Sequence, residues 1–105
     1  MERSEYVRRI LEAYCTTPGT CGVIRRADRL LAAELHERGV PAEAVENALI
    51  LAAARRIIRP EDALPLATVR SLAYFVPVIE EVLEIKVSPE YYRYLRWKLQ
   101  RVLAR

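Results

Sequence analysis

Glycine is scarce in this chain, and so are the side chains that bind metals. Only three of the 105 residues are Gly, which leaves little material for a glycine-rich phosphate loop, and the G-x-x-x-x-G-K motif of such loops does not occur. Cys15, Cys21 and His36 are the only soft metal ligands, and a closed structural zinc site needs one more. We therefore expect no metal and no cofactor.

The sequence also lacks the residue combinations of nucleophilic catalysis. His36 has no nucleophile near it in the sequence, so no Ser/His/Asp set can be assembled around it. Adjacent tyrosines such as Tyr91 and Tyr92 occur in some nickases, but those enzymes also need a metal-binding cluster of His or acidic residues, which we do not find. We expect that the protein is not an enzyme.

Long hydrophobic runs are missing as well. No apolar run approaches the ~20 residues that cross a bilayer, and residues 2–5 (E-R-S-E) are polar where a signal peptide would be apolar. We expect a cytoplasmic protein that makes no membrane contact. A reducing cytosol argues against a disulfide between Cys15 and Cys21, although their spacing leaves that alternative open.

The composition is that of a folded domain. Hydrophobic residues make up 52% of the chain and charged residues 30%, which favours a compact helical protein over a disordered one. A length of 105 residues predicts a single domain over residues 1–105. The formal net charge of +3 permits a nucleic-acid partner without requiring one.

The longest predicted helix runs from Pro41 to Pro60. Its middle, residues 48–54 (A-L-I-L-A-A-A), contains no polar side chain, and about two helical turns of apolar residues leave no face for water. Gly39 suits the end of a preceding helix, and Pro41 suits the start of this one. We predict an all-α fold, a single compact bundle of four to six helices around a central buried helix at about residues 41–59.

Further helices are predicted on both sides of the central one. The first covers residues 5–15 with Ser4 as its cap, the second residues 27–38, and another residues 66–75. Pro77 either starts a helix of its own or kinks a longer one. The apolar stripe of the first helix consists of Tyr6, Val7, Ile10, Leu11 and Tyr14. The apolar positions of the second are Leu30, Leu31 and Leu35. Beyond Pro77 we expect Val78, Ile79, Val82, Leu83 and Ile85 to be buried.

Two charged groups precede the last helix. Glu80, Glu81 and Glu84 are interpreted as a solvated outer face.

The helices at residues 27–38 and 41–60 have the skeleton of a helix-turn-helix, but an all-round apolar helix has no polar face to contact bases. We therefore favour an antiparallel hairpin. Its last turn carries the secondary basic patch, which also opposes the negative end of the helix dipole and consists of Arg55, Arg56 and Arg59.

The last helix is the most basic segment. Ser88, Pro89 and Glu90 combine a cap, a first-turn proline and an early acid, and the helix extends to about Ala104. Its predicted docking stripe is Tyr91, Tyr92, Leu95, Leu99, Val102 and Leu103. The other side carries cations around aromatic rings, namely Arg93, Tyr94, Trp97, Lys98, Arg101 and Arg105.

This basic and aromatic side has three interpretations. Cations that neutralise phosphates, next to rings that stack on unpaired bases, are typical of a surface that binds single-stranded DNA or RNA. An exposed Trp flanked by Arg is equally typical of a protein interface. Alternatively, Trp97 folds over a neighbouring helix and the cations pair with the acidic residues at 80–84.

Two stretches resemble known proteins. Residues 25–41 (R-R-A-D-R-L-L-A-A-E-L-H-E-R-G-V-P) and residues 70–81 (R-S-L-A-Y-F-V-P-V-I-E-E) are similar to short uncharacterised bacterial helical proteins. The second stretch also resembles the C-terminal helical tail of some phage, plasmid and mobile-element replication initiators. The resemblance covers about half of the chain, and the winged DNA-binding domain of the initiators has no counterpart in it. It implies a helical accessory role in DNA replication or mobilisation, with Arg70, Tyr74 and Phe75 as the side chains of the motif.

These observations together predict a non-enzymatic accessory factor of DNA replication or of a mobile genetic element. It would bind nucleic acid, or a replication or mobile-element protein, through the last helix. The alternative is a protein-interaction or oligomerisation module with the same helix as its interface, and homo-oligomers belong to this alternative.

Overall fold

An apolar run with no polar break forms the central helix. The computed structural model describes residues 1–60, 62–85 and 87–104, and in it α3 covers Ala42–Ile57. Gly39 has a φ of +74°, a conformation that suits glycine after a helix. Every residue of 48–54 is buried except Ile50, which is half-buried. Neighbours therefore cover the middle of this helix on every side except that of Ile50, which lines a cleft.

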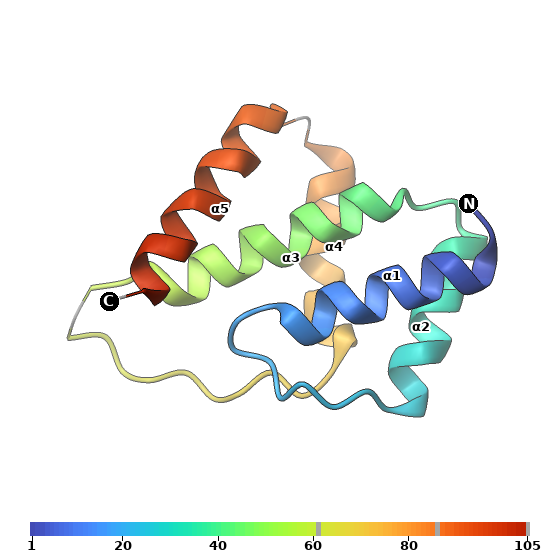
Figure 1. Cartoon of the computed structure of the whole chain (residues 1–105), viewed down its shortest axis with the longest axis horizontal. Helices are drawn as coiled ribbons and strands as arrows, with labels where there is room; N and C mark the ends of the chain where they lie inside the picture. The colour runs from blue at the N-terminus through green and yellow to red at the C-terminus, as the bar shows by residue number, and fades with distance from the viewer. Residues whose placement is uncertain (61, 86, 105) are drawn as a thin grey trace.

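The other elements surround α3 (Figure 1). In chain order the described elements are α1 (Arg3–Thr16), α2 (Arg26–Glu37), α3, the 3-10 helix η1 (Leu72–Phe75), α4 (Val76–Glu84) and α5 (Pro89–Leu103). The predicted all-α bundle of four to six helices is therefore confirmed. Across the three described ranges, no helix has the length and apolar character needed to cross a membrane.

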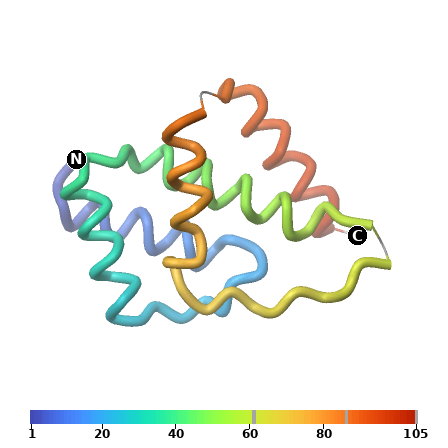
Figure 2. Tube along the Cα trace, turned by 180° about the vertical axis from the view of Figure 1, so that it is seen from behind, coloured from blue at the N-terminus to red at the C-terminus, as the bar shows by residue number. Residues whose placement is uncertain are grey.

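The central helix takes part in two apolar cores. The larger core lies among α1, α2, α3, η1 and α4, and the smaller one between α3 and α5. The smaller core consists of Leu51, Ala53, Ala54, Tyr92, Leu95 and Leu99. α4 passes behind α3 in Figure 1 and in front of it in Figure 2, whereas α2 and α5 lie at opposite ends of the molecule in both views. Small alanines on α3 allow α5 to pack closely.

The predicted antiparallel hairpin of α2 and α3 is wrong. The two helices lie crosswise in both ribbon views (Figures 1 and 2), and α2 packs chiefly on α1 and η1. The short turn between them therefore changes the chain direction without pairing the helices along their length. Because α3 is buried, the crosswise arrangement still leaves no free helix face for a DNA groove.

Of the two predicted serine N-caps, one forms and one does not. Ser4 does not cap α1, because the helix begins two residues earlier than predicted, at Arg3, with Glu2 as its N-cap. The Ser4 hydroxyl instead donates to the Glu2 carboxylate at 3.3 Å. Ser88 does cap α5, since its hydroxyl oxygen accepts from the Tyr91 N–H at 3.4 Å.

The helix predicted at residues 66–75 does not form. Residues 66–71 are not helical, and Val69 instead pairs with the loop after α1. Its N–H donates to the Gly19 carbonyl at 2.8 Å, and its carbonyl accepts from the Cys21 N–H at 2.9 Å. These partners are distant in sequence, so local periodicity could not indicate them. Pro77 lies in the first turn of α4 and starts that helix instead of kinking a longer one.

Some predicted core residues lie at the surface. On α4, Ile79 is buried as expected, and Val78 and Val82 are half-buried. The helix ends at Glu84, and the apolar side chains near its end are exposed. On α5, the two ends of the predicted stripe extend past α3. The exposed residues are Leu30, Leu83, Ile85, Tyr91 and Leu103.

One buried carboxylate joins two distant segments. Asp28, in the first turn of α2, is only 2% exposed. It accepts from the Arg25 N–H at 2.8 Å and from the Leu72 N–H at 2.9 Å. The first hydrogen bond caps α2 and the second satisfies the start of η1. An acid in the first turn of a helix suits the helix dipole, but nothing in the sequence indicates that this one is buried.

We predict that Asp28→Ala destabilises the protein by about 3 kcal/mol, because it leaves buried N–H groups without an acceptor. Asp28→Asn, which keeps one acceptor oxygen, should lose about half as much. Urea unfolding measures both changes. Glu34→Ala, an exposed position on the same helix, is the control and should change stability by less than about 0.5 kcal/mol. An equally small effect of Asp28→Ala would contradict this account of the α2–η1 junction.

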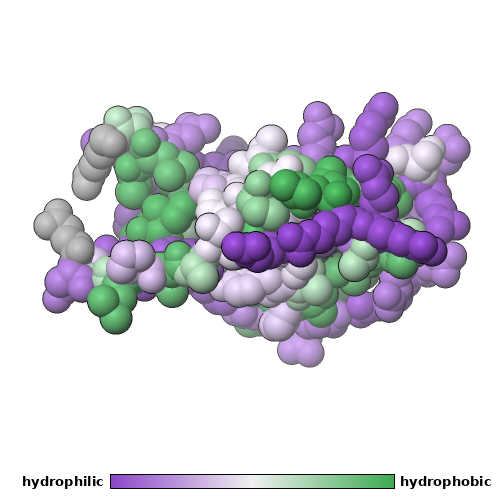
Figure 3. Space-filling model, turned by 90° about the horizontal axis from the view of Figure 1, so that it is seen from below, coloured by the Kyte–Doolittle hydropathy of each residue, from purple (hydrophilic) through white to green (hydrophobic). Residues whose placement is uncertain are grey.

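The connector between α3 and η1 comprises residues 58–71. Arg56, in the last turn of α3, and Arg59, two residues beyond that helix, donate hydrogen bonds to its backbone. Arg56 donates to the Ala67 carbonyl at 2.5 Å and to the Tyr74 hydroxyl at 3.0 Å, and Arg59 donates to the Leu64 carbonyl. Figure 3 views the molecule from the side along which the connector runs, where apolar surface appears among polar side chains. Leu64 on this connector is 82% exposed. Polar contacts to its carbonyls, more than burial, fix its course.

We predict that Arg56→Ala increases cleavage of the connector by a chymotrypsin-type protease roughly 30-fold. Loss of two hydrogen bonds of about 1 kcal/mol each raises the open population, which limited proteolysis reports. Mass spectrometry of the fragments locates the cut. Arg55→Ala removes a neighbouring cation whose hydrogen bonds go to Glu81 on α4, and it should leave the rate unchanged. Equal rates for both variants and the wild type would show that Arg56 does not restrain this segment.

Candidate functional site

The outer face of α5 is positioned by its buried face. Ser88 caps the helix, Pro89 occupies its first turn, and buried residues anchor it at spacings of three and four. Tyr92, Leu95 and Leu99 are each no more than 6% exposed and belong to the core shared with α3. Burying large side chains such as these contributes about 1.5–3 kcal/mol each. The side of α5 away from α3 is thereby held toward solvent.

Three aromatic rings form a row along this helix. Tyr91, Tyr94 and Trp97 are spaced three residues apart, which places them one above the next on a helix surface. Their ring centroids are 6.5 Å and 6.2 Å apart, with interplanar angles of 36° and 31°. They are 45%, 48% and 51% exposed, respectively. We call these three residues the aromatic ladder.

Two cations lie over rings of the aromatic ladder. The Arg101 guanidinium carbon is 4.9 Å from the Trp97 ring centroid, and the Lys98 nitrogen is 5.9 Å from that of Tyr94. Both distances are within the range of cation–π attraction. Arg93 is exposed, and its nearest acid is Glu90 at 3.9 Å. Outside the described residues lies Arg105, the last member of the predicted site.

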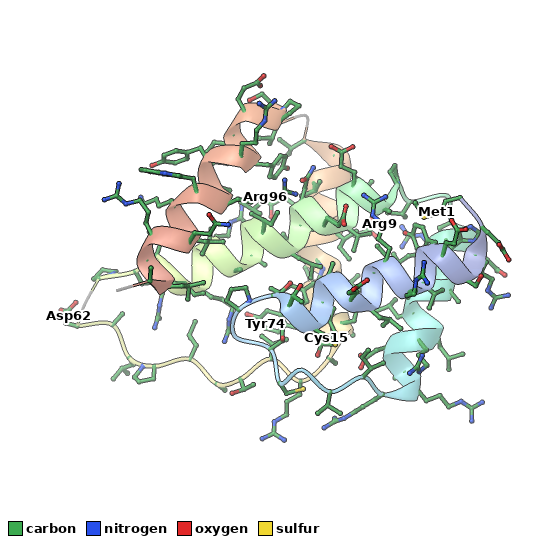
Figure 4. The ribbon with its side chains drawn as sticks, in the orientation of Figure 1. Met1, Arg9, Cys15, Asp62, Tyr74 and Arg96 are labelled. Atoms are coloured by element: carbon green, nitrogen blue, oxygen red, sulfur yellow. The ribbon has the colours of Figure 1, made fainter. Side chains whose placement is uncertain are left out.

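One further cation of α5 has a different environment. Arg96 lines a cleft that also includes Thr17, Glu46 and Ile50, and its label in Figure 4 lies on the side of α5 that faces α3. The structure thus brings Arg93, Lys98 and Arg101 together with the aromatic ladder. It separates Arg96 from them.

The secondary basic patch is engaged within the molecule. Arg55 forms a two-pronged ion pair with Glu81, at 2.8 Å and 2.5 Å, whereas Arg56 and Arg59 contact the connector. The Arg55 guanidinium hydrogen-bonds the Glu81 carboxylate and lowers its pKa from the ordinary value. Glu80 similarly pairs with Arg38 at 2.8 Å. The acidic face of α4 is therefore used by arginines of α2–α3 and not, among the described ion pairs, by those of α5.

A pocket opens beside the first ring of the aromatic ladder. It has a volume of about 350 Å³ and lies among α3, α4 and α5. Leu51, Val82 and Val87 give it apolar walls, and Tyr91 lies at its edge as well as in the aromatic ladder. Arg55, Glu81 and Tyr92 contribute its polar groups. We call it the Tyr92 pocket.

The Tyr92 hydroxyl is unusual in this pocket. The residue is 4% exposed, and its oxygen has no hydrogen-bond partner among the described residues. Burial raises the pKa of this hydroxyl, and the nearby Glu81 carboxylate raises it further. Buried hydroxyls are normally hydrogen-bonded, and this oxygen has almost no surface exposed to the pocket, so it is an unpaired polar group within the packed interior.

Tyr14 has the other buried hydroxyl without a partner in the described part of the chain. Burial, followed by the neighbouring Cys21, raises the pKa of Tyr14 to about 12. Cys15 and Cys21 are free thiols, and each faces a backbone carbonyl, that of Gly22 for Cys15 and that of Val23 for Cys21. The described residues contain no group of three or more His, Cys, Asp or Glu that could hold a metal ion.

A larger depression lies elsewhere. A groove of about 950 Å³ between α1 and α2 is lined by Val7, Leu11, Ile24 and Leu30, with Arg8 among its polar residues. It is open, and neither of the two unpartnered buried hydroxyls lines it. The α5 face, by contrast, combines rings, cations and a pocket. We consider it the better candidate site.

The residues of the initiator-like motif have mixed environments. Phe75 is 1% exposed and packs edge-on against Tyr14, so it is a core residue. Tyr74 is half-exposed, with the Arg56 guanidinium 5.4 Å from its ring centroid. Arg70 is exposed. Tyr74 and Phe75 lie in η1, whereas Glu81, the last residue of the resembling stretch, lines the Tyr92 pocket beside α5.

One member of the site, Tyr91, is not indicated by the apolar pattern of the last helix. On a helical wheel it lies close to Tyr92 and Leu95, which predicts that it belongs to the docking stripe. The structure puts it in the aromatic ladder, at 45% exposure. The spacing of three between residues 91, 94 and 97 was the available signal, since such positions are neighbours on a helix surface.

Comparison with known proteins identifies no relative of this chain. No protein-family model, no curated protein and no solved structure matches this chain. The resemblance of residues 70–81 to the helical tail of replication initiators therefore stays a prediction. The role of the α5 face has to be inferred from its geometry and its charges.

Proposed function

We propose that this protein is a non-enzymatic accessory factor of DNA replication or of a mobile genetic element that binds nucleic acid through the outer face of α5. The aromatic ladder with its overlying cations is the observation that carries the proposal. Rings with exposed faces stack on bases of any sequence, and adjacent cations neutralise phosphates. The replication context comes from the resemblance of residues 70–81 alone.

The spacing of the rings favours a single strand. Bases in one strand of a duplex rise about 3.4 Å each, whereas neighbouring rings of the aromatic ladder are 6.2 Å and 6.5 Å apart. Successive rings therefore suit bases that are separated from one another, as in an extended strand. An α5 ridge with protruding aromatic side chains also needs bases that are free of a pairing partner.

We predict that oligonucleotide affinity falls steeply with salt. If Arg93, Lys98 and Arg101 each neutralise a phosphate, the slope of log K against log salt is about −2, or a roughly 20-fold loss between about 50 and 200 mM salt. Fluorescence anisotropy of a labelled single strand measures it. The double variant Lys98→Gln/Arg101→Gln should bring the slope to about −0.7. Arg26→Gln, which removes an exposed charge from α2 at the other end of the molecule, is the charge control.

Trp97→Ala should act differently from the charge variants in the same experiment. It removes a stacking ring, at a cost of about 1–3 kcal/mol of binding free energy, and leaves the salt slope unchanged. Because the indole is half-exposed, thermal unfolding should change little. Weak binding that does not respond to salt, or equal affinity of wild type and Trp97→Ala, would overturn the proposed function.

A protein partner is the second candidate function. Trp97 is 51% exposed on α5 with the Arg101 guanidinium over its ring, and exposed Trp and Arg are the residue types enriched in interface hot spots. This candidate predicts concentration-dependent self-association that Trp97→Ala weakens, as measured by multi-angle light scattering. A monodisperse monomer at all concentrations, unchanged by Trp97→Ala, would exclude the second-copy form of this candidate.

A further inference from the structure

Consecutive apolar residues of the connector are exposed to solvent. Residues 64–67 (L-P-L-A) all lie at the surface, with Leu64 82% and Leu66 48% exposed. Runs of three or four exposed apolar residues are unfavourable on a folded chain unless they serve a function. We call residues 64–67 the leucine segment.

The leucine segment is held in place by its backbone. Arg59 donates to the Leu64 carbonyl and Arg56 to the Ala67 carbonyl, and the ring of Pro65 fixes one further backbone angle. These restraints leave the leucine side chains free. Little conformational entropy is therefore lost when a second surface covers them.

The groove between α1 and α2 is a complementary surface. Its volume of about 950 Å³ is at the upper end of the ~300–1,000 Å³ of pockets that hold a whole small ligand, so it has room for more than one side chain. Val7, Ile24 and Leu30 line it with apolar surface, and Leu30 is 58% exposed. Leucine side chains placed there would cover apolar surface on both partners.

The charges next to the two surfaces are complementary as well. The groove is lined by three cations against two acids, namely Arg3, Arg8, Arg29, Glu2 and Glu12. None of these three arginines takes part in an ion pair among the described residues. Residues 60–69, which include the leucine segment, contain the acids Glu61 and Asp62 and no cation. An acidic stretch beside the leucines suits a groove whose charged residues are mostly basic.

The two surfaces do not meet within one molecule. No residue of the connector lines the groove. Asp62, at the start of the connector, is labelled at one end of the molecule in Figure 4, and Met1, before α1, is labelled toward the other. Because the arginine contacts hold the leucine segment beside the end of α3, it reaches only the groove of another molecule.

We propose that the leucine segment of one copy docks in the α1–α2 groove of a second copy. This contact goes beyond the proposed function, because it does not use the α5 face. Each partner contributes a different surface, so the contact is head-to-tail, and each copy keeps one surface free for a further copy unless a ring closes. The contact is smaller than a standard interface, so its dissociation constant is about 100 µM to 1 mM.

Sedimentation equilibrium of the whole chain tests the proposal between about 10 µM and 1 mM. We expect the average mass of the wild type to rise with concentration and to pass that of a dimer at about 1 mM, because head-to-tail contacts do not stop at two copies. A wild type that stays monomeric over this range would overturn the proposal and leave the groove to another occupant or to none.

Two variants each remove one surface. Leu64→Ser/Leu66→Ser removes the leucines, and Leu30→Arg puts a charge into the groove. All three positions are exposed, so circular dichroism should show native folding, and each variant should associate about tenfold or more weakly than wild type. Leu83→Ser, at an exposed leucine of α4 outside both surfaces, is the matched control and should behave like wild type.

A mixture of the two variants is the decisive measurement. One variant keeps the leucine segment and the other keeps the groove, so an equal mixture should form dimers of one copy of each and nothing larger. A mixture that stays monomeric would overturn the head-to-tail contact. Association that Trp97→Ala weakens and these variants do not would overturn it as well, because the contact would then lie on α5.

Discussion

The apolar midsection of α3 is the constraint on which the structure depends. Residues 48–54 offer no side to water, so elements must cover the helix around its whole circumference. α1, η1 and α4 cover part of it and enclose the larger core, whereas α5 covers the remainder and forms the smaller core with Leu51, Ala53 and Ala54. One helix is thereby shared between two cores, and α5 is fixed by its contacts with α3 as well as by its short link to α4.

Polar contacts then fix what hydrophobic burial leaves undetermined. The connector before η1 has few buried side chains, and its course depends on the Val69 pairing with the loop after α1 and on arginine contacts to its carbonyls. Asp28 joins the start of α2 to the start of η1. Each of these contacts satisfies a backbone group that a helix or sheet would otherwise satisfy. An irregular segment of this length can therefore be ordered without a core of its own.

The distribution of charge explains why α5 is the candidate site. Arginines at positions 38 and 55 pair with the carboxylates of α4, and those at 56 and 59 hold the connector. The cations at 98 and 101 instead contact aromatic rings, an interaction that leaves their remaining donors available to phosphate. Similar side chains thus have different roles, according to whether an acceptor of the protein lies within reach.

The sequence by itself determined the all-α class, the central helix, the cap at Ser88 and the polarity of the outer face of α5. These follow from apolar periodicity and capping, which act over a few neighbouring residues. Only the tertiary structure decided that residues 66–71 are not helical, that Asp28 is buried and that Tyr91 turns outward beside a pocket. Each of these depends on a partner distant in the chain, namely Gly19, Leu72 and the helices around Tyr92. Long-range hydrogen bonds and the positions where one helix extends past another leave no periodic signal in a sequence.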